Sequence, residues 1–208
     1  PTDLKKQVAE KQDVNYFRDI ACTDEYIFLA TYDGCSRQEM DEHGAGELVP
    51  VLEHLGKAGL AVPVPLSHSG KSIHSLKNKP AQIAPRMMGE HPMPSTIEQV
   101  KQIAIAQAKM HVALKDFPLE RAEYRDQAYW AKVTQELKPN LDVADKILLG
   151  ELVGLYEALT AAYPNRPKGF IHSDLFRDNT LFEGDQLKGI LDFYELNKDE
   201  LLFDIAIT

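Results

Sequence analysis

The sequence predicts an α+β fold in two parts, a strand-rich part over residues 1–90 and a mainly helical part over residues 91–208. In the first part, aromatic and β-branched runs alternate with polar turns, which is typical of short antiparallel strands. The second part opens on long stretches with apolar residues at helical spacing. From residue 169 onward, short strand-like runs return, so we expect the helices to carry a small hairpin.

Two pairs of strands are predicted in the strand-rich part. The segment NYFRDIACTDEYIFLATYDG (15–34) reads as two strands around a Cys-Thr-Asp-Glu turn, and Asp33-Gly34 closes the second strand. Residues 73–89 form the other pair, with the turn at Lys77-Asn78. These runs predict a small antiparallel sheet.

A single helix is predicted between the strand pairs, over residues 47–60, and Gly59 ends it. The preceding His43-Gly44-Ala45-Gly46 has two glycines spaced as in a dinucleotide-binding motif. It lacks the third glycine and does not follow a strand directly, as that motif requires. We interpret it as a flexible lead into the helix.

The helical part is predicted to begin with a capping box formed by Ser95 and Glu98. The residues that follow at helical spacing are Ile97, Val100, Ala104, Ala108 and His111. A second long helix is expected from Val143 to Tyr163, and its apolar stripe consists of Leu148, Leu152, Leu155, Leu159 and Ala162. Strands are then expected at 169–172, 180–183 and 187–193, with a turn at 183–185.

Composition excludes several classes of protein. The 208 residues suffice for a sizeable core, and the net charge of -9 argues against a nucleic-acid partner. No apolar window is long enough for a membrane span, and no signal peptide is recognisable. Cys22 and Cys35 are expected to be free thiols, and the seven histidines lack zinc-site spacing. The chain lacks an initial Met and ends within an apolar run, so we expect truncation at both ends.

The chemistry is concentrated in the segment GFIHSDLFRDNTLFEGDQLKGILDFYEL (169–196). His172, Asp174 and Asn179 follow the pattern H-x-D-x-x-x-x-N of a kinase catalytic loop. Asp192 follows thirteen residues later, at the end of an apolar strand. Phosphoryl transfer needs a carboxylate that accepts the proton of the attacking hydroxyl, together with oxygen ligands for Mg²⁺. We therefore expect Asp174 to be the base and Asn179 and Asp192 to be the magnesium ligands.

An alternative interpretation is that the acidic residues only cap backbone turns. For Asp178 and Asp185 this interpretation is favoured. Asp174 and Asp192 directly follow apolar strand residues, where an ionised carboxylate is costly unless it is paired. For these two residues a functional role is favoured.

The segments FIHSDLFRDNTLFEGDQLKGILDFY and LLFDIAIT resemble the kinase core of the aminoglycoside/choline phosphotransferase superfamily, and within it the homoserine kinases. The segments around 78–100 and QAKMHVAL resemble that family's inter-lobe connector and first long helix. The resemblance implies a protein-kinase-like fold with a strand-rich N-lobe and a mainly helical C-lobe. It also implies that part of the N-lobe and a block of C-terminal helices are missing, since family members are roughly half as long again.

The resemblance assigns roles to individual residues. Asp174 matches the catalytic base, Asn179 and Asp192 match the Mg²⁺ ligands, and His172 matches the histidine that anchors the loop. Asp204 matches an aspartate that braces the catalytic loop. His111 matches the histidine at the end of the first long helix, which we interpret as core support.

Two kinase features are absent from the sequence. The strand YIFLATY has no lysine at the position that binds the α- and β-phosphates, so Lys11, Arg37 and Arg86 are the candidates for that contact. The stretch QVAEKQDVNYF is poor in the glycines that let backbone N–H groups approach phosphate. The helix glutamate that would orient a lysine is Glu42 or Glu47.

We expect an ATP- and Mg²⁺-dependent kinase of L-homoserine, serving threonine biosynthesis in the cytoplasm, with Arg177 and Tyr194 as substrate contacts. No long activation segment follows Asp192, which favours a small-molecule acceptor. The alternatives are another acceptor, such as an aminoglycoside or choline, or a nucleotide-binding pseudokinase. The sequence predicts no oligomeric state.

Overall fold

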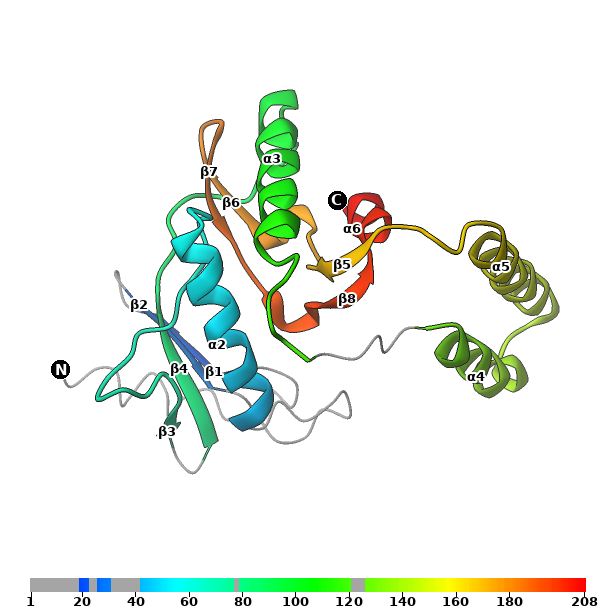
Figure 1. Ribbon diagram of the computed structural model, residues 1–208, viewed down its shortest axis with the longest axis horizontal. Coiled ribbons are helices and arrows are strands. Elements are labelled where there is room, and N and C mark those ends of the chain that lie inside the picture. Colours follow the sequence, from blue (N-terminus) through cyan, green and yellow to red (C-terminus); the bar gives the residue numbers. More distant parts are fainter. Residues whose placement is uncertain (1–18, 23–25, 31–41, 77–78, 121–125) are drawn as a thin grey trace.

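The computed structural model describes residues 19–22, 26–30, 42–76, 79–120 and 126–208 (Figure 1). A four-stranded sheet and one helix form the N-terminal part. A long helix, two small strand pairs and a short final helix form the part that carries the candidate site. A pair of helices stands apart from both (Figure 1).

The N-terminal sheet contains β1 (Asp19–Cys22), β2 (Tyr26–Ala30), β3 (His74–Leu76) and β4 (Lys79–Pro85). Its order is β1-β2-β4-β3, and every neighbouring pair is antiparallel. Both predicted strand pairs are thus confirmed, and the pairing of β2 with β4 joins them into one sheet. The turn residues 23–25 and 77–78 lie outside the described part of the chain.

Helix α2 (Glu42–Lys57) begins five residues earlier than predicted. The segment His43–Gly46 therefore lies inside the helix, and the expected flexible lead is wrong. Glycine has a poor helix propensity, which costs about 1 kcal/mol per residue, and burial of the side chains on the core face outweighs this cost. The buried side chains on that face are Leu48, Val51, Leu52 and Leu55. The helix stops as predicted near Gly59, whose φ of +82° suits glycine.

Helix α3 (Ile97–Ala113) begins one residue later than the predicted capping box implied. Thr96 accepts a hydrogen bond from Gln99 N at 3.1 Å, and Gln99 Oε1 accepts one from Thr96 N at 2.8 Å. Ser95 and Glu98 are therefore not the capping pair. The residues predicted at helical spacing are mostly exposed, whereas the buried face consists of Ile103, Ala106, Gln107 and Met110.

The helices that stand apart are α4 (Gln127–Leu137) and α5 (Val143–Ala162), joined through the 3₁₀ helix η1 (Lys138–Asn140). Asp126 and Asp142 cap α4 and α5 through hydrogen bonds to backbone N–H groups. Helix α5 confirms the prediction to within one residue, whereas α4 was not predicted. The predicted stripe of α5 is exposed, with Leu148, Leu152 and Leu155 each more than half accessible.

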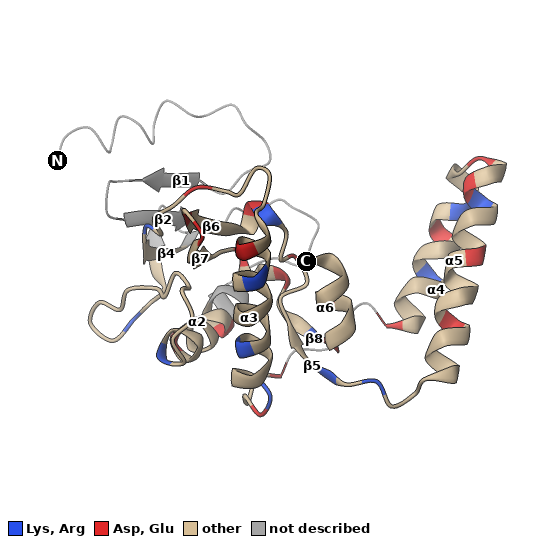
Figure 2. Cartoon of the chain, turned by 90° about the horizontal axis from the view of Figure 1, so that it is seen from above, with Lys and Arg blue, Asp and Glu red and all other residues tan. Residues whose placement is uncertain are grey.

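Charged residues of both signs are interspersed along α3, α4 and α5 (Figure 2). Among the described residues, no helix is long and apolar enough to cross a membrane.

Two antiparallel strand pairs build the last part of the chain. Strand β5 (Lys168–Ile171) pairs with β8 (Asn197–Glu200), and β6 (Thr180–Glu183) pairs with β7 (Gln186–Ile190). The three predicted strands are confirmed, although the last ends at Ile190 because Asp192 adopts a left-handed backbone conformation. Strand β8 has the polar sequence NKDE, which gave no strand signal. The chain ends in α6 (Leu201–Ile207), at the predicted apolar run.

An apolar cluster of described residues joins the two parts of the chain. It combines residues of α2 and α3 with residues beside the predicted catalytic loop; among them are Leu55, Met110, Leu114, Leu175, Ile190 and Leu196. Ile190 N also donates to Ala61 O at 2.8 Å, which fixes the end of β7 to the segment that follows α2. The segment that precedes Asp192 is thus held by the core. The division of the chain at residue 90 stays a prediction.

Candidate active site

The loop after β5 presents one partly exposed carboxylate from a buried backbone. Ile171, His172, Ser173 and Leu175 are buried, whereas Asp174 is intermediate in exposure. The buried neighbours hold this stretch in the core, and within residues 171–175 Asp174 is the least buried side chain. The strand–loop arrangement predicted for this segment is therefore present.

His172 joins this loop to the segment before Asp192. Its Nε2 donates to the backbone oxygen of Leu191 at 2.8 Å. The centroid of its ring lies 4.6 Å from the centroid of the Phe193 ring. Burial lowers the pKa of His172, which keeps the imidazole neutral. Its Nδ1 is buried and has no hydrogen-bond partner within the described part of the chain. These contacts agree with an anchoring rather than a chemical role.

Asp174 and Asn179 are directly hydrogen-bonded. Asn179 Nδ2 donates to the backbone oxygen of Asp174 at 2.7 Å and to its Oδ2 at 3.1 Å. The intervening turn is closed by Phe176 N, which donates to Asp174 O, and by Asn179 N, which donates to Phe176 O. The chain then enters the 3₁₀ helix η2 (Arg177–Asn179) and β6. The five-residue spacing thus places the carboxylate and the amide side by side.

Asp192 is brought to the same place by the β6–β7 hairpin. Leu191 N donates to Asn179 O at 2.8 Å, so the residue before Asp192 is fixed to the end of the loop. Asp192 has φ +59°, a left-handed conformation uncommon outside glycine, asparagine and aspartate. The pKa of Asp174 is raised, chiefly by burial; the hydrogen bond from Asn179 opposes this and the charge of Asp192 adds to it. The structure therefore gathers Asp174, Asn179 and Asp192.

This group fits a hard divalent cation in its chemistry. Both amide hydrogens of Asn179 are used by Asp174, which leaves the amide oxygen as the atom that can bind a metal. Asp192 supplies a carboxylate, and Mg²⁺ prefers oxygen ligands and keeps several waters or phosphate oxygens. Within the described ranges, no cluster of three or more His, Cys, Asp or Glu side chains forms a metal cage of its own. Such a site would need ligands from a bound phosphate or from water.

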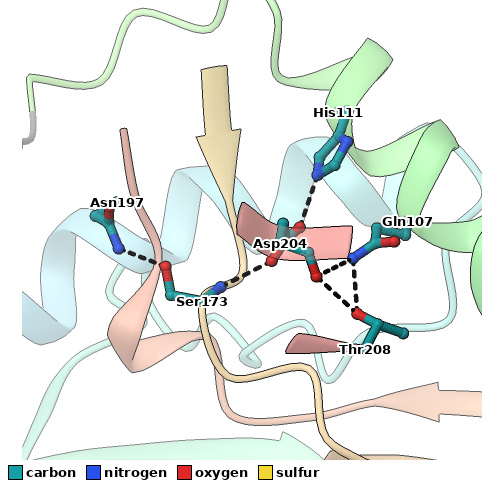
Figure 3. A network of polar contacts seen from close by, with 6 residues as sticks. All are labelled: Gln107, His111, Ser173, Asn197, Asp204 and Thr208. Carbon is teal, nitrogen blue, oxygen red and sulfur yellow. Dashed lines mark hydrogen bonds and ion pairs between the residues drawn. The ribbon is translucent and has the colours of Figure 1, made fainter. Parts of the chain in front are cut away.

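A buried polar network supports the loop from behind (Figure 3). Asp204 of α6 is fully buried, and its Oδ1 accepts a hydrogen bond from Ser173 N at 3.0 Å. Its Oδ2 lies 2.6 Å from Nε2 of His111, on α3. Asn197 Nδ2 donates to Ser173 Oγ. The interaction of Asp204 with the catalytic loop agrees with the bracing role that the resemblance implied.

The remaining candidates lie around this centre or outside the described residues. Arg177 is exposed in η2, Tyr194 follows Asp192 at intermediate exposure, and Arg86 is exposed one residue beyond β4. Lys11 and Arg37 lie outside the described part of the chain. These assignments therefore stay predictions.

The two acidic residues interpreted as turn residues differ in their surroundings. Asp178 is exposed within η2. Asp185 follows Gly184 in the β6–β7 turn, and its Oδ1 accepts a hydrogen bond from Thr96 Oγ1 at 2.8 Å. Gln99 Nε2 also donates to Gly184 O at 2.8 Å. The turn is thus fastened to the start of α3, a link that joins residues 89 positions apart and that no local pattern revealed.

Sequence reasoning missed several polar members of the supporting network. Ser173 was treated only as a spacer inside the motif, whereas Gln107 and Asn197 were not singled out at all. Gln107 Nε2 donates to the backbone oxygen of Asp204 at 3.0 Å and to Thr208 Oγ1 at 2.8 Å. One usable signal was the polar Gln107 within the otherwise apolar centre of α3.

The four-stranded sheet, the long helices and the loop that carries Asp174 and Asn179 together define a protein-kinase-like phosphotransferase fold. Residues 37–208 match the phosphotransferase enzyme family, and the chain belongs to this family.

Named relatives are consistent with this membership. The chain is 34% identical over 166 residues to a homoserine kinase of Cupriavidus metallidurans, covering 76% of this chain and 51% of the relative. It is 32% identical over 161 residues to a homoserine kinase of Pseudomonas aeruginosa, covering 77% of this chain and 51% of that protein. The chain thus spans about half the length of the curated relatives it matches.

Solved structures share the fold. An aminoglycoside 2'-phosphotransferase-IIIa in complex with GDP superposes with a TM-score of 0.71 at 17% identity, covering 99% of this chain and 75% of that one. An amicoumacin kinase in complex with AMP-PNP and Ca2+ superposes with a TM-score of 0.65 at 16% identity, covering 88% of this chain and 56% of that one. The predicted α+β, protein-kinase-like fold is confirmed.

Proposed function

We propose that this chain carries the catalytic centre of an ATP-dependent kinase that phosphorylates the hydroxyl of L-homoserine. The observation that carries the proposal is the direct hydrogen bond between Asp174 and Asn179, with Asp192 brought beside them by the hairpin. The homoserine kinase relatives at 32–34% identity support the choice of acceptor. As part of the same proposal, the reaction belongs to threonine biosynthesis in the cytoplasm.

In this proposal Asp174 is the general base. The homoserine hydroxyl oxygen forms a bond to the γ-phosphorus while the bond from that phosphorus to the ADP oxygen breaks, and the hydroxyl proton passes to a carboxylate oxygen of Asp174. Burial raises the pKa of Asp174, which strengthens it as a proton acceptor. The hydrogen bond from Asn179 fixes the direction of that carboxylate. The neutral ring of His172 holds the loop against Leu191.

Asn179 and Asp192 would hold Mg²⁺ through their oxygens. When bound there, the cation neutralises charge on the phosphates of ATP. The role of these two residues is to keep one neutral and one charged oxygen ligand at a fixed separation from the base. The backbone bond from Leu191 N to Asn179 O makes this possible, because it couples the two ligand-bearing segments directly.

The remaining contacts follow from charge. The carboxylate of homoserine favours a guanidinium partner, and exposed Arg177 lies three residues after the base. Tyr194, two residues after Asp192, is a further substrate contact in this proposal. Arg86 and Lys11 are the candidates for binding the nucleotide phosphates. Because β2 carries no lysine, a cation from another segment has to serve there.

Release of ADP by the full-length protein tests this function. L-homoserine, choline and an aminoglycoside are offered in turn with ATP and Mg²⁺, and the Asp174→Asn variant is the control for contaminating kinases. We expect turnover with homoserine that the variant lacks. Turnover with choline or the aminoglycoside but not with homoserine would show that the compound turned over, and not homoserine, is the acceptor. Binding of ATP without transfer to any of the three would instead indicate a pseudokinase.

A further inference from the structure

The support of the catalytic loop depends on a carboxylate that has no access to solvent. Asp204 is 0% exposed, and a buried carboxylate is costly unless hydrogen bonds compensate for lost hydration. Burial by itself raises the pKa of Asp204, but the hydrogen bonds from His111 and Ser173 together outweigh it and hold that pKa below its ordinary value. Asp204 is therefore ionised, and its two oxygens have separate partners (Figure 3).

One of these partners is a strained point of the catalytic loop. Ser173 has φ +67°, in the left-handed region, which costs a residue with a Cβ about 1–2 kcal/mol. Its N–H is held by Asp204 Oδ1, and its hydroxyl accepts a hydrogen bond from Asn197 Nδ2. Ser173 directly precedes Asp174, so this bend sets the direction in which the proposed base leaves the core.

The other partner, His111, lies in the last turn of α3 and is mostly buried, with 10% of its side chain exposed. Because Asp204 can only accept, Nε2 of His111 is the donor in their 2.6 Å contact. Gln107 of the same helix donates to the backbone oxygen of Asp204 instead. Helix α3 thus holds the backbone of α6 through Gln107 and orients the Asp204 carboxylate through His111.

We propose that His111 is a positioning residue for the phosphoryl transfer, a role that rests on the proposed function. By binding Oδ2 of Asp204, it directs Oδ1 towards the N–H of Ser173. This contact holds the left-handed bend that aims Asp174 at the acceptor hydroxyl. His111 therefore acts on the reaction through two hydrogen bonds without touching substrate, and it does more than support the core.

The chain offers a pair of substitutions and a matched control. The amide nitrogen of Gln can reach the position of histidine Nε2, whereas the shorter Asn cannot, and both remain polar. His111→Gln should therefore keep the contact with Asp204, and His111→Asn should lose it. His54 on α2 is the control, because its Nε2 also makes a 2.9 Å hydrogen bond, to Ala113 O, and among the described residues no hydrogen bond links its side chain to the catalytic loop.

Steady-state kinetics on the full-length protein, per folded molecule, provide the first readout. We expect His111→Asn to lower kcat about 10- to 100-fold, the usual cost of a misplaced catalytic group. KM for ATP and homoserine should stay within about twofold, because the substituted residue touches neither. His111→Gln should recover most of kcat, and His54→Asn should lower the melting temperature without changing kcat. Equal kcat values for His111→Asn and the parent protein would overturn the proposal.

Amide hydrogen exchange at Ser173, followed by NMR, separates this inference from the proposed function. We expect exchange of the Ser173 N–H to accelerate at least tenfold in His111→Asn but not in His54→Asn or His111→Gln. A tenfold change corresponds to about the net free energy of one hydrogen bond. This readout requires no turnover, so a parent protein that phosphorylates no alcohol would refute only the function. Unchanged Ser173 exchange in His111→Asn would refute the positioning role, whatever the substrate.

Discussion

Asn179 donates both hydrogens of its side-chain amide to Asp174, one to the backbone oxygen at 2.7 Å and one to the carboxylate at 3.1 Å. This pair of bonds closes the loop. It leaves the amide oxygen of Asn179 as the side-chain atom that can bind another ligand. It also means that the two residues cannot reorient independently. The consequences of this geometry can be tested by substitution.

Asp174→Asn should lower kcat by about 10²- to 10⁴-fold, the usual contribution of a general base. The asparagine oxygen can still accept the hydrogen bond from Asn179, so the loop should keep its conformation and the melting temperature should change little. Kinetics and thermal unfolding of the same preparation measure the two effects. Near-normal turnover in this variant would remove Asp174 as the base.

Asp192→Asn should raise the Mg²⁺ concentration needed for half-maximal activity about tenfold or more, because a charged ligand becomes neutral. Asp178→Asn is the matched control, since Asp178 carries the same charge in the same segment but is exposed in a turn. Its Mg²⁺ requirement should change less than about twofold. If both variants shift the Mg²⁺ titration equally, a general loss of negative charge explains the effect and Asp192 is not a ligand.

Asp204 should make stability depend on pH in a defined direction. Its pKa is lowered in the folded protein, so its contribution to the free energy of unfolding is present above the ordinary aspartate pKa of about 3.9 and is lost as pH falls through the lowered value. Asp204→Asn should therefore be less stable than the parent by about 2 kcal/mol at pH 7. Urea unfolding from pH 7 to pH 3 should show this difference shrinking. A difference that stays constant over that range would contradict the lowered pKa of Asp204.

Gly89→Ala should weaken the junction between the sheet and the hairpin. Gly89 has φ +114°, and a Cβ there would lie 2.7 Å from the backbone oxygen of Phe182. The neighbouring Glu90 pairs with Phe182 through two backbone hydrogen bonds, so the connector would have to move away from β6. We expect a loss of at least about 2 kcal/mol in the free energy of unfolding.

Gly150→Ala is the control for this substitution. Gly150 lies inside α5, and nothing stands within 4 Å of the added carbon. Alanine should raise the free energy of unfolding by up to about 1 kcal/mol there, because it favours a helix over glycine. Chemical denaturation of both variants compares them directly, and an equal loss for both would show that Gly89 has no special role.

The local pattern of the sequence was sufficient for the centre of the site. The spacing from His172 to Asn179 specifies one short loop, and the hairpin that follows has its turn at Gly184, so the meeting of Asn179 with the residue before Asp192 could be predicted. Hydrogen bonds within a few residues, or across a tight hairpin, depend on nearby sequence alone. The nucleotide-binding side could not be predicted in this way, and its candidates Lys11 and Arg37 lie outside the described residues.

What the sequence determined by itself was most of the helices and strands, α4 and β8 excepted, and the spacing of the catalytic loop, because backbone periodicity and turn chemistry are local properties. The tertiary structure decided which faces are buried and which distant side chains meet. Helical spacing in α3 fits more than one face, and only packing against α2 and β7 selects Ile103 and Met110 over Ile97 and Val100. The contact of His111 with Asp204 spans 93 residues, and only burial of that carboxylate makes its partner necessary.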